Sequence, residues 1–419
     1  MTSSRGTIPA EVAAAVAEAH RREWAFVLAA TVRVTRDIDL AEECVQEAYA
    51  SALSAWPAHG VPVRTGAWLT TAARNRGLDL LRRDQTARRC LPLLLDDAAS
   101  PGPEASDEPE IPDDRLRLIF TCCHPGIAVE AQVALTLRLL CGLTTAEVAR
   151  AFLVSEATMA ARITRAKKKI AAARIPYRVP SAADLPERID AVLSVVHLLY
   201  TTGHTAPSGP GLIRVDLVER SLDLARMLRE LLPYDPNVAA LLALILLTDA
   251  RSRARTDVQG RMILLSEQDR SRWDHGAIAE GVSLVREALR SRPPSRYALM
   301  AAISAVHSEA PSWDRTDWAE LVGLYDLLVA TWPSPVVALN RAVALGFAQG
   351  PLAGLTALDE LGTEPQLAHY GYLAVARAEF LTRLGRIAEA RLAYTEALML
   401  TENAQERALL EVKLGALPR

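Results

Sequence analysis

The chain has 419 residues, of which 50% are apolar and 23% charged, and its formal net charge is −3. At about 100–200 residues per domain, this length predicts two to four domains. The longest apolar runs, around Leu241–Leu247, are much shorter than the roughly 20 residues that cross a bilayer. The first ten residues lack a signal-peptide pattern, and five cysteines without framework spacing argue against a secreted disulfide scaffold. We therefore expect a bacterial protein of the cytoplasm.

Residues 1–95 are predicted to form a small helical module. Its first recognisable element, Asp39–Tyr49 (DLAEECVQEAY), is an acidic helix. Glu43, Gln46 and Glu47 are three and four residues apart, so they should project from one face. A turn-rich stretch, Trp56–Pro62, follows this helix.

A second helix of this module is predicted to begin near Gly66. On it Asn75, Asp79 and Arg82 share one face and Arg76 and Arg83 another, while an apolar group is expected to be buried: Trp68, Leu69, Ala72 and Ala73. An ordinary helical bundle with solvated charges is also consistent with this spacing.

Residues 96–112 are predicted to be a flexible linker. They contain six acidic residues and no basic one, and they are rich in proline and serine. Repulsion between the like charges should keep such a segment extended.

Residues 113–178 are basic, with 11 Lys and Arg against five Asp and Glu. Thr144 and Glu147 have the spacing of a capping box at the start of a short helix. Leu153 and Val154 would make a turn, and Ser155 is a suitable N-cap for a longer helix that ends near Ala172. This arrangement predicts a helix-turn-helix, although many such units have glycine where this chain has Leu153.

The longer helix has an apolar stripe and, beside it, a basic one. The apolar stripe consists of Met159, Ile163, Ala166 and Ile170, and the basic one of Thr158, Arg162, Arg165 and Lys169. Such a basic face suits phosphates and base edges in a major groove. A solvated basic helix end is the alternative, because cations also suit a helix C-terminus. The two capped helices together with the basic face favour DNA binding.

Residues 179–419 are predicted to form a helical extension with five more acidic than basic residues. Arg377–Leu414 has the pattern of a tetratricopeptide-like helix pair with Leu384 and Gly385 at its turn. Ala338–Leu361 matches the same pattern more weakly. An irregular helical bundle is as compatible with 185–330 as a solenoid. The predicted fold class of the whole chain is all-α.

Two other groups of polar residues have both a structural and a chemical interpretation. Cys122, Cys123 and His124 are adjacent, so on one helix they would point about 100° apart, and small buried cysteines are favoured over a metal site. Ser266–Gly276, which contains His275, could imitate an acid–base site, but a buried polar network is favoured. No catalytic residue, metal or cofactor is predicted.

The motifs "DLAEECVQEAY", "AWLTTAARNRGLDLLRR" and "LTTAEVARAFLVSEATMAARITRAKKKI" resemble the extracytoplasmic-function (ECF) sigma factors of bacterial RNA polymerase. The extension, with "LLALILLTDARSRARTD" and "LLSEQDRSRWD", resembles the subgroup that has tetratricopeptide-like helices after the two sigma modules. In that subgroup a leucine is expected at position 153.

The resemblance implies a role for each module. Region 2 (1–95) would bind core polymerase through Asp39, Glu42, Glu43, Gln46 and Glu47, and a loop at 58–65 would capture a flipped −10 base. Residues expected to contact −10 DNA are Arg74, Asn75, Arg76, Arg82 and Arg83. Region 4 (113–178) would contact the −35 element through Ser155, Glu156, Thr158, Met159, Arg162 and Arg165, with Lys167, Lys168 and Lys169 on phosphates.

The sequence therefore predicts a sigma factor that performs no covalent chemistry and has core RNA polymerase and promoter DNA as partners. The extension would regulate it, by docking on regions 2 and 4 or on polymerase, so truncation after about residue 180 should change promoter activity. The alternative is a DNA-binding regulator with a tetratricopeptide-like interaction domain that does not engage polymerase. An enzyme in the extension has little support beyond the polar cluster at 266–275.

Overall fold

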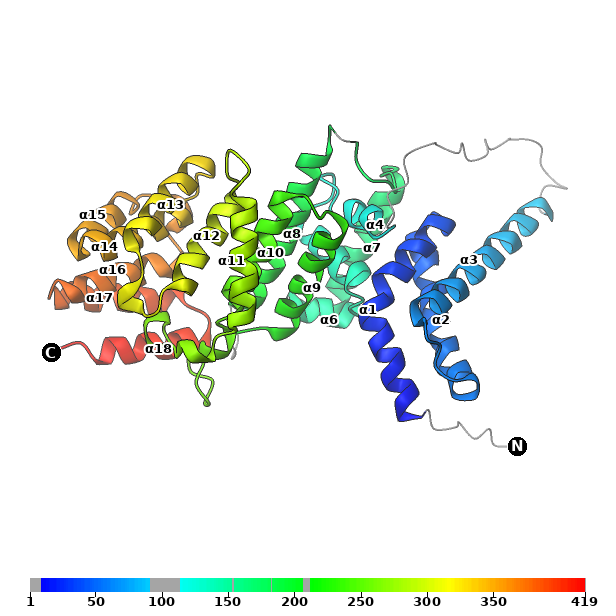
Figure 1. The fold of residues 1–419 in the computed structure, drawn as a ribbon, viewed down its shortest axis with the longest axis horizontal. Helices are drawn as coiled ribbons and strands as arrows, with labels where there is room; N and C mark the ends of the chain where they lie inside the picture. The colour runs from blue at the N-terminus through cyan, green and yellow to red at the C-terminus, as the bar shows by residue number, and fades with distance from the viewer. Residues whose placement is uncertain (1–8, 91–113, 153, 182, 206–211, 419) are drawn as a thin grey trace. The chain divides into compact units, whose positions relative to one another are not determined.

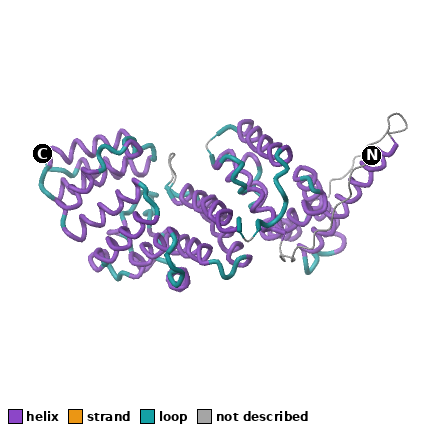
Figure 2. The backbone as a smooth tube through the Cα atoms, turned by 90° about the horizontal axis from the view of Figure 1, so that it is seen from above, coloured by secondary structure: helices purple, strands orange, loops and turns teal. Residues whose placement is uncertain are grey.

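A computed structural model describes residues 9–90, 114–152, 154–181, 183–205 and 212–418 of the chain. In these residues the secondary structure is helical, and an isolated β bridge joins Thr256 and Met262 (Figure 1, Figure 2). The all-α fold class is therefore confirmed. The predicted linker 96–112 and the turn residue Leu153 lie outside the described residues. The chain divides into two compact units, 1–195 and 196–419.

The first unit begins with three long helices and continues with five shorter elements. These are α1 (Ala10–Thr35), α2 (Ile38–His59), α3 (Thr65–Cys90), α4 (Asp114–Cys122), α5 (Val129–Leu135), the π-helical turn η2 (Thr136–Leu140), α6 (Thr145–Ala151) and α7 (Glu156–Ala172). Helices α1, α2 and α3 pack against one another as a bundle, and α1 also packs against α4 and η2.

Local signals determine where α1 ends and α2 begins. Arg36 has a φ of 56°, in the left-handed region, and its backbone N–H donates to the carbonyl of Val32. Asp37 then caps α2, because its carboxylate accepts a hydrogen bond from the N–H of Leu40 at 3.0 Å. The resulting turn brings α2 back against α1, in which Val27 and Leu28 are completely buried.

The predicted turn at Trp56–Pro62 is wrong in its first half. Helix α2 continues through Pro57 to His59, and only 60–64 form a loop. A proline inside a helix removes one N–H donor and its ring crowds the carbonyl four residues earlier, so Pro57 weakens this end of α2. Burial of Trp56 against Trp68, with ring centroids 5.7 Å apart, stabilises this last turn.

The second unit follows α8 (Leu185–His204), which spans the division between the units. Its helices are α9 (Val215–Leu231), α10 (Pro236–Asp249), α11 (His275–Ala288), α12 (Arg296–Glu309), α13 (Trp318–Thr331), α14 (Pro335–Gln349), α15 (Pro351–Glu360), α16 (Gly371–Arg383), α17 (Ile387–Leu400) and α18 (Ala404–Gly415). Short 3₁₀ turns lie between them at Ser252–Ala254, Leu265–Glu267, Arg270–Arg272, Trp313–Arg315 and Pro365–Leu367.

Helix α10 is the centre of the first half of this unit. Every residue from Val238 to Leu247 is buried, because α9, α11 and α12 all pack around it. A helix that is apolar on all sides is expected only where it is enclosed by others.

The last helices, α14–α18, form a second apolar cluster around Phe380. The side chain of Phe380 lies against Gly346 and Gly354, where any Cβ would come within 3 Å of its ring. The predicted turn of the helix pair is confirmed, since Gly385 has a φ of 72° between α16 and α17, but the predicted range Arg377–Leu414 contains a third helix, α18. The tetratricopeptide identity of the pair remains a prediction.

Candidate functional site

The five predicted polymerase contacts on α2 are divided between two environments. Glu43, Gln46 and Glu47 are exposed to solvent, as their spacing predicts. Asp39 is exposed at the start of the helix, but Glu42 is only 5% exposed because it faces the second half of the unit. Four of the five predicted contacts are therefore open to solvent, and Glu42 is buried.

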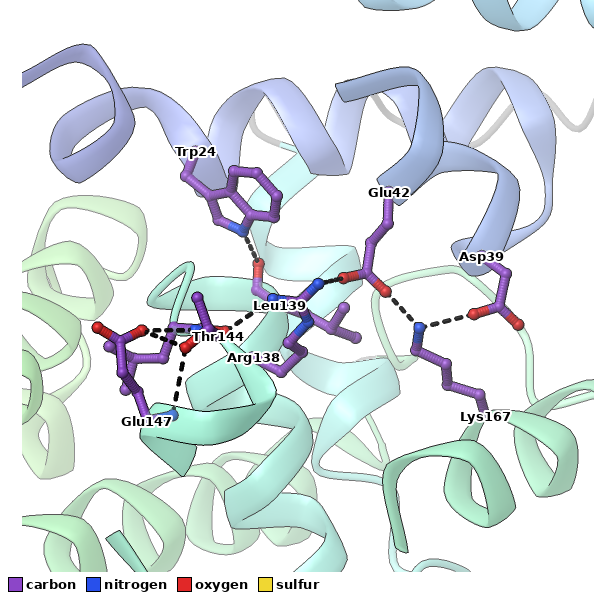
Figure 3. Close-up of polar contacts among 9 residues, drawn as sticks. Trp24, Asp39, Glu42, Arg138, Leu139, Thr144, Glu147 and Lys167 are labelled. Atoms are coloured by element: carbon purple, nitrogen blue, oxygen red, sulfur yellow. Dashed lines mark hydrogen bonds and ion pairs between the residues drawn. The ribbon is translucent and has the colours of Figure 1, made fainter. Parts of the chain in front are cut away.

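Glu42 is covered by two basic residues that come from more than 90 positions further along the chain (Figure 3). Lys167 on α7 donates from Nζ to a carboxylate oxygen of Glu42 and, at 2.6 Å, to Oδ1 of Asp39. The guanidinium of Arg138, on η2, forms an ion pair with Glu42 at 2.9 Å. We refer to Asp39, Glu42, Arg138 and Lys167 as the clasp.

Further contacts join the same two modules beside the clasp. The indole N–H of Trp24 donates to the carbonyl of Leu139 at 3.0 Å (Figure 3), and the hydroxyl of Tyr177 donates to the carbonyl of Ala29 at 2.9 Å. Gly142 has a φ of 68°, and a Cβ there would lie 3.0 Å from the ring of Trp24. Both the backbone conformation and the close approach therefore require glycine at this position.

Within the clasp, the contact between Lys167 and Glu42 is nearly enclosed, whereas Asp39 is at the surface. The side chains of Lys167 and Glu42 are 12% and 6% exposed. Burial alone would lower the pKa of Lys167, but the neighbouring carboxylates of Glu42 and Asp39 outweigh it and raise the pKa above its ordinary value. Removing one partner of a buried ion pair typically costs about 3–5 kcal/mol, because the other charge is left without compensation.

The predicted −10 DNA contacts lie on α3, and most of their side chains are exposed. Arg74, Asn75, Arg82 and Arg83 are exposed. Arg76 is half-buried, and its Nε donates to Glu47 on α2 at 2.5 Å, so it also links the two helices. The loop at 60–64, part of the segment predicted to capture a base, presents a fully exposed Val63.

The helix-turn-helix elements of the second module begin where the sequence predicts. Thr144 accepts from the N–H of Glu147 at 3.2 Å, and the Glu147 carboxylate accepts from the N–H of Thr144 at 2.7 Å, which completes the capping box (Figure 3). Ser155 caps α7 by accepting from the N–H of Thr158 at 3.2 Å. The expected caps are confirmed.

The outward face of α7 holds most of the predicted −35 contacts. The exposed ones are Ser155, Glu156, Thr158, Arg165, Lys168 and Lys169, and Arg162 is half-buried, with its guanidinium 5.5 Å from the ring of Phe152. Met159 is completely buried with Ile163, Ala166 and Ile170, so it belongs to the core and does not lie on the DNA-facing side. Lys167 is in the clasp rather than on the phosphate-binding surface.

Replacing Arg165 and Lys169 together by alanine should weaken binding to duplex DNA and reduce its dependence on salt. Each phosphate contact contributes about 0.9 to the slope of log K against log salt concentration, so loss of two contacts predicts a slope smaller by about 1.8. Fluorescence anisotropy with labelled duplex between low and moderate salt measures the slope. The double variant of Arg290 and Arg292, two exposed arginines of the second unit, removes the same charge. An equal change in both variants would contradict a DNA contact at α7.

The cysteines near the start of the second module are structural. Cys122 and Cys123 are buried, as expected, and burial raises the pKa of Cys123 to about 12. A thiol that stays protonated at neutral pH is a poor metal ligand and nucleophile. No group of three potential metal ligands occurs among the residues that the structure describes.

The predicted buried polar network at 266–276 is only partly found, because most of this segment is exposed and its side-chain hydrogen bonds to distant segments come from Arg270 and Arg272. The guanidinium of Arg270 donates to the carbonyls of His307 at 2.9 Å and Ala310 at 2.7 Å, and Arg272 donates to the carbonyl of Arg253 at 2.6 Å. His275 is the exposed first residue of α11. These contacts join the segment between α10 and α11 to the end of α12.

Comparison with known families identifies the two modules of the first unit. Residues 20–87 match Sigma-70 region 2 and residues 117–170 match Sigma-70 region 4. The chain belongs to the sigma-70 family. The order of its regions is the ECF-type arrangement, and the family is non-enzymatic. Sigma factors of this family bind core RNA polymerase and direct promoter-specific initiation. The residues predicted to make these contacts lie on α2, α3 and α7.

The extension of this sigma factor is also found in other proteins. Residues 188–289 match a family of unknown function, DUF6596. An uncharacterized protein of Rhizobium meliloti (strain 1021) is 42% identical to the sigma factor over 395 residues, which is 93% of each chain. No solved structure matches the chain.

In the described residues, no helix has the length and apolar character needed to cross a membrane.

Proposed function

We propose that this sigma factor binds core RNA polymerase through the exposed face of α2, contacts the −10 element through α3 and reads the −35 element through α7. The observation that carries the proposal is the separation of two surfaces of opposite charge. Glu43, Gln46 and Glu47 form an acidic surface on one module, and α7 carries an exposed basic surface on the other. An acidic surface suits a basic protein partner, and a basic one suits DNA. Because its template lies there, such a protein would act in the cytoplasm.

The clasp adds a conformational step to this function. Asp39 and Glu42 belong to the predicted polymerase contact, yet region 4 occupies both through Lys167. Since the Glu42 side chain cannot contact Lys167 and polymerase at the same place, the chain must open between regions 2 and 4 before the whole contact is available. The free form is therefore proposed to be closed, and its apparent affinity for polymerase is reduced by the fraction of molecules that are closed.

The extension is proposed to regulate this step. Residues 179–419 carry 24 basic and 29 acidic residues, so they could cover a basic DNA-binding face or contact polymerase. The proposal predicts that promoter activity changes when the extension is removed.

Co-purification with core polymerase tests both parts. The full chain is compared with a chain that ends after His204, which keeps all of α8 because Arg188 on this helix donates to the carbonyl of Phe120. A stoichiometric complex with both chains, but different promoter activity, supports a regulatory extension. Binding by the shorter chain alone would mean that the extension masks the polymerase contact. If neither chain binds core polymerase, the protein is a DNA-binding regulator and the proposed function fails. Identical promoter activity of the two chains would contradict the regulatory role of the extension.

A further inference from the structure

A cavity lies within the second unit, where three segments of the extension meet. Its volume is about 780 Å³, and small-molecule sites in proteins typically have volumes of about 300–1,000 Å³. One wall is the C-terminal end of α8, a second is the segment around Met262, and the third comes from α16, α18 and the end of α17. The cavity is therefore large enough for an organic molecule of moderate size, and it lies apart from the predicted polymerase and DNA contacts.

Most of the cavity wall is apolar. Several aliphatic side chains line it and are only partly buried: Met262, Leu264, Val375, Leu400 and Leu409. Val375 also packs against the apolar cluster around Phe380, so the core holds this part of the wall in place. Covering apolar surface is worth about 25 cal/mol per Å², so the wall would stabilise an apolar molecule in the cavity.

A carboxylate and two aromatic rings lie together in the same wall. The hydroxyl of Tyr372 donates to Oε1 of Glu406 at 2.5 Å, and the ring centroids of Tyr370 and Tyr372 are 5.2 Å apart. All three residues line the cavity. No described residue donates to Oε2 of Glu406, so this carboxylate keeps an acceptor oxygen for a ligand.

The charged groups that line the cavity favour a cation. Glu402 and Glu406 are acidic and Lys413 is basic. Lys413 already has a partner, because its Nζ donates to Oε2 of Glu379 at 2.7 Å. The carboxylates of Glu402 and Glu406 therefore lack a lysine or arginine ion pair among the described residues.

The other basic groups beside the cavity are also engaged or uncharged. The terminal nitrogens of Arg255 donate to the carbonyl of His204 and, at 3.0 Å, to the hydroxyl of Thr205. Nδ1 of His204 lies 3.0 Å from the hydroxyl of Tyr200. Burial, together with the charges of Arg255 and Arg251, lowers the pKa of His204 to about 2, so its imidazole is neutral. These groups do not provide a site for an anion.

We propose that this cavity binds an amphipathic primary amine, with its apolar body against the aliphatic wall and its ammonium group on Oε2 of Glu406. The ammonium and the carboxylate would form a charge-assisted hydrogen bond, and the rings of Tyr370 and Tyr372 attract a cation. An alcohol of the same length would lose the attraction between charges, and a fatty acid would place another carboxylate beside Glu406. The inference does not depend on polymerase binding.

Titration calorimetry of the full chain tests the site with three probes that differ only in the head group: decylamine, decanol and decanoate. Each is used at neutral pH, where the amine is protonated, and below the concentration at which it aggregates. We expect saturable binding of one decylamine per chain, about tenfold tighter than decanol, with decanoate the weakest of the three.

Glu406→Gln tests the proposed ammonium contact. The variant loses the charge but keeps an oxygen that accepts from the hydroxyl of Tyr372, so the fold should not change. It should weaken decylamine binding about tenfold and change decanol binding by less than about twofold. Glu411→Gln is the matched control, because Glu411 is exposed on the same helix and does not line the cavity.

Val375→Trp tests the cavity itself. The larger side chain would occupy part of the volume, so it should weaken decylamine and decanol alike, and circular dichroism checks that the helices remain folded. Val412→Trp makes the same change at an exposed position of α18 and should leave both affinities unchanged.

Three results would overturn the proposal. The first is no saturable binding of any probe, and the second is decanol or decanoate binding at least as tightly as decylamine. The third is equal affinity of the wild type, Glu406→Gln and Glu411→Gln for decylamine, which would mean that the amine does not contact Glu406.

Discussion

Substituting alanine for both Glu43 and Gln46 is expected to weaken the complex with core RNA polymerase by about 10–100-fold, provided that these residues are hot spots of the interface. Both side chains are exposed on α2 and neither contributes to the clasp, so their loss leaves the free chain unchanged. Glu47 is a less suitable target, because it accepts from Arg76 at 2.5 Å and its removal would also loosen α3. Titration of labelled chain with core polymerase measures the dissociation constant.

The control for this experiment is the double substitution of Glu11 and Glu18 by alanine. Both residues lie on α1, and the ion pairs of Glu18 with Arg21 and Arg22 are on the surface, where such pairs contribute little to stability. The control should bind polymerase like the wild type. If both double variants bind with wild-type affinity, the exposed face of α2 is not the polymerase contact.

Replacing Lys167 by glutamate is expected to raise the affinity for core polymerase. The variant places a third carboxylate beside Asp39 and Glu42 and removes the cation that holds them, so the closed form should lose most of its population. If between 1% and 10% of wild-type molecules are open, full opening raises the apparent affinity by about 10–100-fold. The same titration with core polymerase measures this change.

Lys168→Glu is the matched control for the clasp, because Lys168 is the adjacent exposed residue and the change in charge is identical. Circular dichroism checks that the helices of both variants remain folded, and Arg138→Gln, which removes the other cation of the clasp, should act in the same direction with a smaller effect. Equal affinities for polymerase in the Lys167 and Lys168 variants would show that the clasp does not limit binding.

The features that the sequence predicted well are local. Thr144 and Glu147, three residues apart, satisfy each other within one turn, and Ser155 caps α7 through its own next turn. The stripe from Met159 to Ile170 is buried because residues three and four apart share a helix face. Such interactions depend on short stretches of chain, so pattern and spacing suffice to find them.

The features that the sequence did not predict depend on residues far apart in the chain. Lys167 is separated from Glu42 by 125 residues, and a lysine in a basic run has the same local pattern whether it faces phosphate or carboxylate. Arg138 and Trp24 have no spacing signal that relates them to the clasp. Gly142 is the one residue of this contact that could have attracted notice, since a glycine before a capped helix suggests a special backbone conformation.

The extension illustrates the same limit. The sequence indicated a polar network at 266–276, and in the structure Arg270 of this segment donates to the carbonyl of His307 on α12. His275, the residue that most suggested chemistry, is exposed instead. Residue type alone therefore separates polar from apolar positions but does not show which polar side chains meet in the core.

Promoter-specific initiation is the central claim, and an in vitro transcription assay tests it most directly. Core polymerase is incubated with a pool of genomic fragments, alone or with the chain, and the 5′ ends of the transcripts are sequenced. We predict that the chain directs initiation at a subset of fragments that share −35 and −10 sequences, and that the Glu43 and Gln46 double variant loses this activity. Transcripts identical to those of core polymerase alone would contradict the account.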